Sequence, residues 1–374
     1  MLGGGTVTLD STAFTLSGGT YTGVIRDGVS AGSLAKIGEG TLTLTGVNTY
    51  SGGTTLQAGV LLLNGKDRLL TTGSIVLNGG TLDLGGNSQT AGLISLNSGL
   101  IRNGTLTSGT GFNALSGDVD AILAGTAALT KSGPGTLTLR LGNTYSGGTT
   151  LAGGVLTISS SERLLQEGYL TIDGGTFDLG GFTQTVGLLT FRSGSIVNGT
   201  LIATGFNVEY GVVNSSFTGS GRMIKTTDGL AVLTGQSFYT GGTQIDAGTL
   251  QLGGNDRLPV AGEILMNAGL FDLGGFTQAS GTLTLATGEV SNGTLFSSGY
   301  LLRSGTVSAV LSGTQSLVKD GAGALSLSGV NSYTGGTILN AGSLVLSGGD
   351  DRLSTSGSIA TTGGVLDLGG NSQT

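Results

Sequence analysis

The sequence predicts an all-β protein, a β-solenoid that winds as an elongated rod around a single core. Three observations lead to this fold class: a glycine-rich composition, an internal repeat of about 95 residues, and short alternating apolar runs. Gly accounts for 76 of 374 residues and Pro for only 2, while 37% of residues are hydrophobic and 10% are charged. This mixture lacks the signature of disorder and suits β-structure with many tight turns.

The repeat is visible in four families of residues that recur at nearly constant spacing. Successive tyrosines lie 95, 94 and 94 residues apart, and the other three families keep this interval to within one residue. The families are Tyr50, Tyr145, Tyr239 and Tyr333; Lys36, Lys131, Lys225 and Lys319; Arg68, Arg163, Arg257 and Arg352; and Asp83, Asp178, Asp272 and Asp367. Cutting after each lysine predicts full copies at 37–131, 132–225 and 226–319, with partial copies at 1–36 and 320–374.

Within the first full copy, the predicted strands follow one another with turn residues between them. They occupy 41–45, 59–63, 74–77, 81–84, 93–96 and 105–107. Leu, Ile and Val alternate there with Thr, Ser or Asp, which is typical of strands with one buried face. No segment keeps a helical apolar period, so we expect almost no helix.

Two architectures accommodate such short strands: an array of Ig-like sandwiches, or a solenoid. A sandwich of this size normally has longer strands and a central core aromatic residue, whereas Trp is absent here and aromatics make up 5% of the chain. A solenoid needs short strands, frequent corners and stacked aliphatic residues. We therefore expect coils of about 19 to 24 residues, four or five to a copy.

The repeated polar residues are interpreted as structural, and no cofactor or metal is expected. Each tyrosine is followed by Gly-Gly and is predicted to cover the edge of a coil, although a ligand platform is an alternative. Each arginine follows an acidic residue and is predicted to fold back onto a carbonyl or acid, although a binding stripe is an alternative. Each LDLGG or FDLGG aspartate suits an Asx turn, because one Asp per copy cannot supply the six or more oxygens of a calcium site.

Catalysis and several kinds of ligand are disfavoured by what the sequence lacks. There is no His and no Cys, so the usual proton shuttle and thiolate nucleophile are missing. The nearest carboxylate pair, Asp118 and Asp120, has Val213 and Ser215 as its counterparts in the next copy. A threonine array of the ice-binding kind does not persist beyond the second copy. A net charge of −7 with scattered basic residues argues against a nucleic-acid partner.

The segments 38–63 and 133–158, GEGTLTLTGVNTYSGGTTLQAGVLLL and GPGTLTLRLGNTYSGGTTLAGGVLTI, resemble the passenger-associated transport repeat of bacterial autotransporters. Less similar copies lie at 227–252 and 321–346. The resemblance implies a right-handed parallel β-helix, carried to the cell surface by type V secretion. It also implies a stalk that assists outer-membrane translocation and folding, with adhesive or self-associating activity. The alternative function is a carbohydrate-binding or carbohydrate-cleaving β-helix.

The same reasoning bears on location and partners. No run of eighteen apolar residues exists that could form a membrane-spanning helix, and the N-terminus lacks the pattern of a signal peptide. We expect an extracellular or surface-exposed fragment of a longer protein. Its expected partners are other copies of itself, end to end or laterally, or a host or surface glycan or protein.

Overall fold

The computed structural model describes residues 5–9 and 13–374. Parts of the predicted copy 1–36, residues 1–4 and 10–12, therefore lie outside the described residues. Within the described ranges every regular element is a β-strand and there is no helix, which confirms the predicted fold class. The chain divides into two units, residues 1–187 with 197–199 (unit 1) and residues 188–196 with 200–374 (unit 2).

The strands are mostly three to nine residues long, with two long exceptions, β9 and β16. In chain order they are β1 (Thr6–Leu9), β2 (Phe14–Leu16), β3 (Gly19–Tyr21), β4 (Val24–Asp27), β5 (Leu34–Lys36), β6 (Thr41–Leu44), β7 (Thr54–Leu56), β8 (Val60–Leu63), β9 (Ile75–Ala114), β10 (Gly117–Ala124), β11 (Leu129–Lys131), β12 (Thr136–Leu139), β13 (Thr149–Leu151), β14 (Val155–Ile158), β15 (Leu170–Asp178), β16 (Thr183–Val208), β17 (Gly211–Thr218), β18 (Arg222–Lys225), β19 (Leu230–Leu233), β20 (Thr243–Ile245), β21 (Thr249–Leu252), β22 (Ile264–Met266), β23 (Leu270–Asp272), β24 (Thr277–Leu285), β25 (Glu289–Ser291), β26 (Thr294–Leu302), β27 (Gly305–Val307), β28 (Val310–Ser312), β29 (Leu317–Lys319), β30 (Ala324–Leu327), β31 (Thr337–Leu339), β32 (Ser343–Leu346), β33 (Ile359–Thr361) and β34 (Val365–Asp367).

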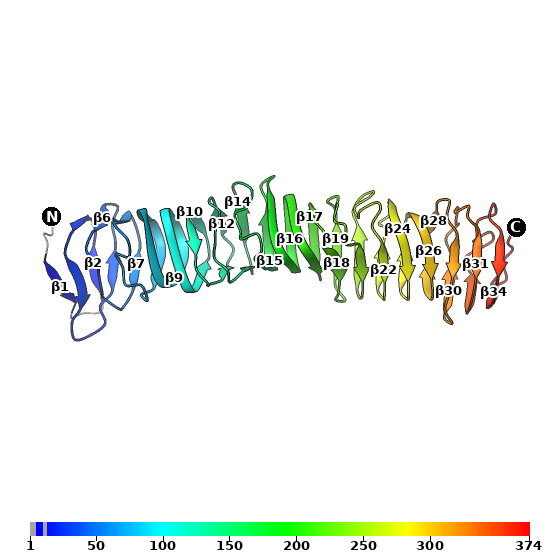
Figure 1. Ribbon diagram of the computed structural model, residues 1–374, viewed down its shortest axis with the longest axis horizontal. Coiled ribbons are helices and arrows are strands. Elements are labelled where there is room, and N and C mark those ends of the chain that lie inside the picture. The colour runs from blue at the N-terminus through cyan, green and yellow to red at the C-terminus, as the bar shows by residue number, and fades with distance from the viewer. Residues whose placement is uncertain (1–4, 10–12) are drawn as a thin grey trace. The chain divides into compact units, whose positions relative to one another are not determined.

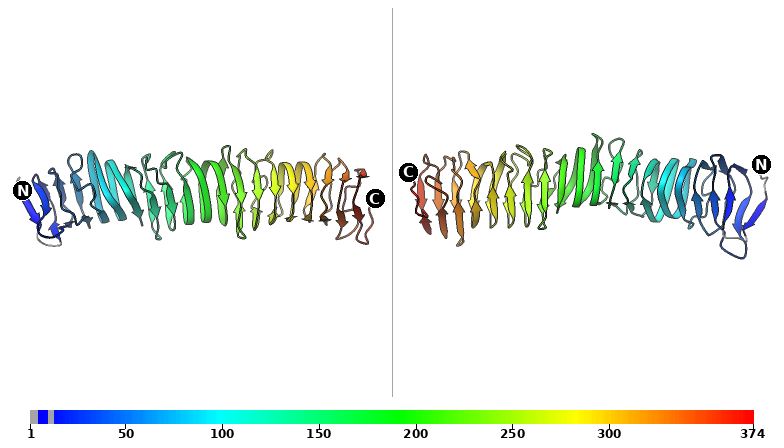
Figure 2. Two further views of the ribbon diagram at one scale, coloured as in Figure 1. Left: turned by 60° about the horizontal axis from the view of Figure 1, so that its bottom comes forward. Right: turned by 180° about the vertical axis from the view of Figure 1, so that it is seen from behind.

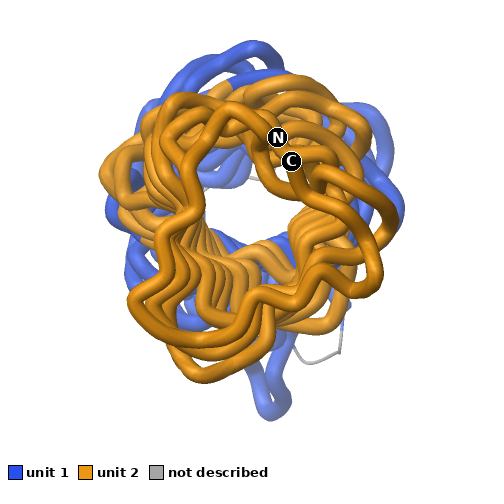
Figure 3. Tube along the Cα trace, turned by 90° about the vertical axis from the view of Figure 1, so that its right-hand side faces the viewer, with its two compact units in different colours: residues 1–187, 197–199 blue, residues 188–196, 200–374 orange. Residues whose placement is uncertain are grey.

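Within each unit the strands stack in parallel, each pairing with a strand one coil further along the chain (Figures 1 and 2). In unit 2 one stack contains β18, β20, β22, β24, β26, β29, β31 and β33, and a second contains β19, β21, β23, β25, β27, β30, β32 and β34. The coils of unit 2 lie over one another when viewed along the stack (Figure 3).

Coil length follows from the register of these stacks. Successive partners are 17 to 21 residues apart from Met223 through Thr243, Ile264, Leu283 and Tyr300 to Leu317, so five coils make up one copy. This count of five agrees with the expected four or five coils. Three of the five steps, of 19, 20 and 21 residues, lie within the expected length of 19 to 24, and the two steps of 17 residues are shorter.

The core of each unit is built from the inward residues of every strand. In unit 2, Leu250, Phe271, Val290, Val307 and Leu327 are register partners on consecutive coils, and all are fully buried. Their outward neighbours are mostly partly exposed, which is the pattern that the period-two alternation predicts. Burial of such aliphatic ladders contributes about 25 cal/mol for each Å² of apolar surface removed from water.

The separate strands expected at 74–77, 81–84, 93–96 and 105–107 are one continuous strand, β9. Its corners stay extended enough to keep bonding to the adjacent coils, and residues with positive φ turn the chain. Gly80 has φ 69° and Asn103 has φ 65°. Asn is one of the few residues with a side chain that adopts this left-handed conformation readily.

Candidate functional site

The repeated tyrosines lie inside the coils. Tyr145 is 1% exposed, and its hydroxyl is 2.7 Å from Thr149 Oγ1, which is itself buried. The ring packs 5.9 Å from that of Phe112, centroid to centroid. Tyr50, Tyr239 and Tyr333 form the same hydroxyl pair with the Thr four residues later. A ligand platform requires a ring that a ligand can reach, and none of these four rings is accessible.

The repeated lysines are enclosed by backbone carbonyl groups. Lys131 is fully buried, and its Nζ donates to the carbonyl oxygens of Ser132 at 2.9 Å, Gly133 at 3.0 Å and Gly153 at 2.9 Å. Because Gly153 belongs to the following coil, the ammonium group joins two coils. Burial lowers the pKa of this lysine, and likewise that of Lys36, Lys225 and Lys319.

Gly154, which follows one of these carbonyls, cannot be replaced without moving the cage. Its φ is 66°, and a Cβ atom there would lie 2.7 Å from Lys131 Nζ and 2.4 Å from each of two carbonyl oxygens. Only glycine fits both the conformation and the space. The same demand explains Gly59, Gly248 and Gly342, which occupy the equivalent position directly before β8, β21 and β32.

Buried amide side chains join the coils on the side between the two main stacks. Leu123 N–H donates to Asn143 Oδ1 at 2.8 Å, and Asn143 Nδ2 donates to the Arg163 carbonyl at 2.9 Å. One coil further on, Leu164 N–H donates to Gln184 Oε1 at 2.9 Å, while Gln184 Nε2 donates back to the Leu164 carbonyl at 3.1 Å. We call these side chains amide staples; the other buried ones are Asn48, Asn331, Gln89 and Gln278, and the partly exposed Gln373 makes the same bonds.

The acid–arginine dipeptides connect a coil to both of its neighbours. Arg163 Nη1 donates to the Arg140 carbonyl on the preceding coil at 3.1 Å, as expected for an arginine that folds back. Glu162 has φ 57°, and its carboxylate accepts from Thr185 N–H on the following coil at 2.9 Å. The other three arginines and acids repeat these contacts.

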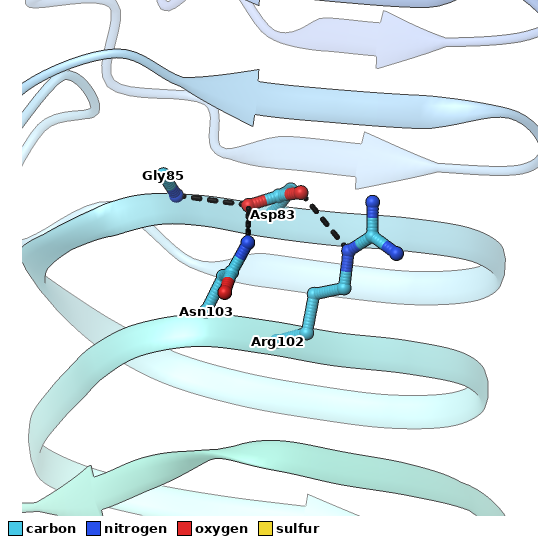
Figure 4. Close-up of polar contacts among 4 residues, drawn as sticks. All are labelled: Asp83, Gly85, Arg102 and Asn103. Atoms are coloured by element: carbon cyan, nitrogen blue, oxygen red, sulfur yellow. Dashed lines mark hydrogen bonds and ion pairs between the residues drawn. The ribbon is translucent and has the colours of Figure 1, made fainter.

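The repeated aspartates cap turns. Asp83 Oδ1 accepts from Gly85 N–H at 2.9 Å, which is the expected Asx-type bond, and from Asn103 Nδ2 at 3.2 Å (Figure 4). Its other oxygen is 2.9 Å from Arg102 Nε. Asp178, Asp272 and Asp367 make the same bond to the N–H two residues later. Among the described residues, no group of three or more acidic side chains is arranged to hold a metal ion.

The carboxylate pair considered for catalysis lies on the outer face of β10. Asp118 Oδ1 forms an ion pair with Arg140 Nη2 at 2.7 Å, and the two side chains are 41% and 46% exposed. Asp120 is also exposed and is the register partner of Arg102. These residues lie on an open sheet face, without an enclosed cavity around them.

Sequence reasoning noted the lysines only as markers of the repeat, and it missed the amide staples and the buried threonines. The staples have a recognisable signal: Asn48, Asn143 and Asn331 stand two residues before a repeated tyrosine, and each Gln stands in a Gln-Thr or Gln-Ala pair after Asp-Leu-Gly-Gly. Their recurrence in the copies could have identified them. Hydropathy alone assigns all of them to the surface.

Comparison with known proteins gives two matches. Residues 34–63, 129–158, 223–252 and 317–346 match the passenger-associated-transport-repeat family. The chain is also similar to the "Adhesin BmaC autotransporter" of Brucella suis biovar 1 (strain 1330), with 31% identity over 320 residues. That alignment covers 72% of this chain and 9% of the adhesin, so the chain spans less than a tenth of the length of the relative. No solved structure matches the chain. In the parts that the structure describes, no helix is both long and apolar enough to cross a membrane.

Proposed function

Because the chain belongs to the autotransporter passengers with passenger-associated transport repeats, we propose that it is a structural segment of a cell-surface protein. In this function it is a stalk that carries other parts of the protein away from the cell and assists its own export. The relative is named an adhesin, which supports an adhesive role for the longer protein. We also propose that the chain has no enzymatic role, because Asp118 is engaged by Arg140 on an open face.

The observation that carries this proposal is the recurrence of the same coil-to-coil contacts in successive copies. Lys36, Lys131 and Lys319 each donate to a carbonyl of the next coil, and every copy has an acid and an arginine that bond in opposite directions along the stack. The last folded coil therefore presents polar groups to which the next coil can bond. Such nearest-neighbour contacts suit a chain that emerges unfolded and adds one coil at a time.

The experiment compares Lys131→Met with Lys66→Met in the full-length parent protein, displayed on intact cells. Lys131→Met leaves three carbonyl oxygens without their donor, which costs about 3 kcal/mol or more. Lys66 is exposed, so its replacement changes stability by less than about 0.5 kcal/mol.

Surface labelling and protease resistance on intact cells measure the outcome. If coil formation assists export, Lys131→Met lowers the amount of labelled protein at the surface, and Lys66→Met leaves it at the wild-type level. A wild-type parent that never becomes accessible from outside would exclude the surface role. If Lys131→Met is unfolded and the two variants are still exported equally, the role in translocation is excluded, and the surface role is not affected.

A further inference from the structure

Copy 226–319 carries exposed apolar residues at positions where the other copies are mostly polar. Phe238 occupies the position that is Thr49, Thr144 and Ser332 in the other copies. Val260 occupies the position that is Thr71, Gln166 and Thr355. Phe296 stands where the first copy has Thr107 and the second has Ile202. Pro259, one of only two prolines in the chain, precedes Val260 and restrains the backbone there. Because the other copies form the coil with mostly polar residues at these positions, folding of the coil does not explain Phe238, Val260 and Phe296.

These three side chains line two adjoining depressions in unit 2. One has a volume of about 330 Å³ and is lined by Phe238, Pro259 and Val260, among others. The second, of about 380 Å³, includes Val260 and Phe296, so Val260 borders both. Phe238, Val260 and Phe296 are 59%, 51% and 50% exposed. We call this surface the apolar groove.

The groove runs along the stack, across successive coils. Ser237 N–H donates to the Arg257 carbonyl, which places Phe238 beside Pro259, and Ala279 is the register partner of Phe296. Three coil steps therefore separate the two phenylalanines, which is roughly 14 Å at the spacing of β-strands. An elongated ligand could contact both rings at once.

The polar groups around the groove are neutral. No Asp, Glu, Lys or Arg lines either depression. Beside Phe296, the side chains of Ser298, Thr314 and Gln315 are exposed and make no hydrogen bond to any described residue. They supply both donors and acceptors next to an aromatic face. That combination suits a ligand that is itself neutral, with apolar C–H faces and many hydroxyl groups.

We propose that the apolar groove binds a neutral oligosaccharide, with one sugar ring against Phe238 and another against Phe296. Ser298, Thr314 and Gln315 then bond to hydroxyl groups of the sugar bound at Phe296. The inference deepens the proposed surface function, since it names a class of ligand for a displayed adhesive segment. A protein partner is the other occupant that the experiment distinguishes.

The experiment uses the 374-residue chain and the probes cellopentaose, maltopentaose, and mannan and galactan fragments. Oligogalacturonate and heparin fragments serve as anionic comparisons. Two variants, Phe238→Thr and Phe296→Thr, introduce the residue that the first copy carries, so the coil should fold unchanged; thermal melting checks this. The matched control is Phe276→Asn, because Phe276 is also exposed, lies outside both depressions, and corresponds to Asn87 and Asn371.

We expect at least one neutral probe to bind, and each groove variant to weaken its binding about tenfold. Phe276→Asn should bind as the wild type does. Irradiation of aromatic protons in the wild type should also transfer saturation to the sugar, a readout that needs no variant. Binding of none of the neutral probes, equal binding by all variants, or binding of anionic probes alone would overturn the proposal. The proposal would also be overturned if the chain bound a protein and no sugar, and if both groove variants abolished that protein binding. None of these results alters the surface-labelling outcome that tests the stalk.

Discussion

At the residue scale, the interior of this solenoid holds ionisable side chains that are satisfied by neutral partners. Each repeated tyrosine shares a hydroxyl contact with a threonine, and each repeated lysine donates to at least one backbone carbonyl oxygen. Burial raises the pKa of Tyr333 to about 12, and raises the pKa of Tyr50, Tyr145 and Tyr239 as well. The contact with threonine opposes this effect and is the smaller influence.

The raised tyrosine pKa values predict a loss of stability in alkali. A tyrosine whose pKa is higher in the folded state stabilises the fold fully below its unfolded pKa of 10, and this contribution is lost as pH rises above it. Each such tyrosine makes the free energy of unfolding fall by about 1.4 kcal/mol per pH unit. The lysines act with the opposite sign, since their pKa is lowered, and their contribution grows only until pH approaches 10.5. Above that pH the tyrosines dominate.

Denaturant unfolding followed by circular dichroism between pH 10 and about pH 12 measures this slope. Tyr145→Phe should be less stable at neutral pH, because Thr149 loses its partner, yet its stability should fall less steeply in alkali by about 1.4 kcal/mol per pH unit. The control variant is Tyr169→Phe, which replaces a tyrosine that is 67% exposed. Identical slopes for Tyr145→Phe and the wild type would show that the buried hydroxyl does not set the alkaline limit.

At the element scale, the amide staples supply links between coils where a loop such as 140–148 replaces a strand. Asn143 bonds to backbone groups on the coils before and after it. Copy 226–319 has Ser237 at this position, and its Oγ is buried without a partner among the described residues. A hydroxyl is too short to reach both neighbouring coils, so this copy lacks one link that the others have.

Exchanging the two residue types tests the staple. We expect Asn143→Ser to lower the free energy of unfolding by about 2 kcal/mol, because buried backbone groups lose their partners. Ser237→Asn should raise it by about 1 kcal/mol. Ser237→Ala is the control and should be close to neutral, since it removes a hydroxyl that has no partner. Calorimetric melting of the three variants measures these changes, and a Ser237→Asn variant that is no more stable than Ser237→Ala would refute the staple.

Sequence patterns predicted the repeat, the strand type and the inward residues of elements such as β6 and β8, because local alternation is set by the pleat of the strand. They could not predict that β9 would pass through its corners as one strand, since that depends on bonding to coils distant in sequence. The burial of Lys131, Asn143 and Gln184 was equally hidden. Hydropathy assigns such residues to the surface, and only the carbonyl and amide groups of neighbouring coils make their burial favourable.

At the scale of the whole molecule, the 94- or 95-residue repeat is also a count of coils. Because five coils make up one copy, Lys131 and Lys225 end equivalent strands, β11 and β18. The sequence further predicts one core running through all copies and a right-handed winding, and both remain predictions. If they hold, whole copies are interchangeable along the chain, whereas a part of a copy is not.

Deletion of residues 132–225 tests this interchangeability. It joins Lys131 to Thr226, the residue that follows the equivalent Lys225. The next strands can therefore continue the stacks of the preceding copy. We expect a cooperative thermal transition with the circular dichroism of a β-protein, and a maximum dimension in X-ray scattering shorter by roughly 24 Å, five strand spacings. Deletion of 132–178 is the control: it joins Lys131 to Leu179. Residues 176–178, at the end of β15, pair with β14 and not with the stack of β11 and β13, so every later residue then enters the wrong side of the coil. This control should melt at a markedly lower temperature or fail to fold. Equal stability of the two deletions would mean that the coils do not depend on register. A scattering profile of separate compact domains, with no shortening after deletion of 132–225, would contradict the single core.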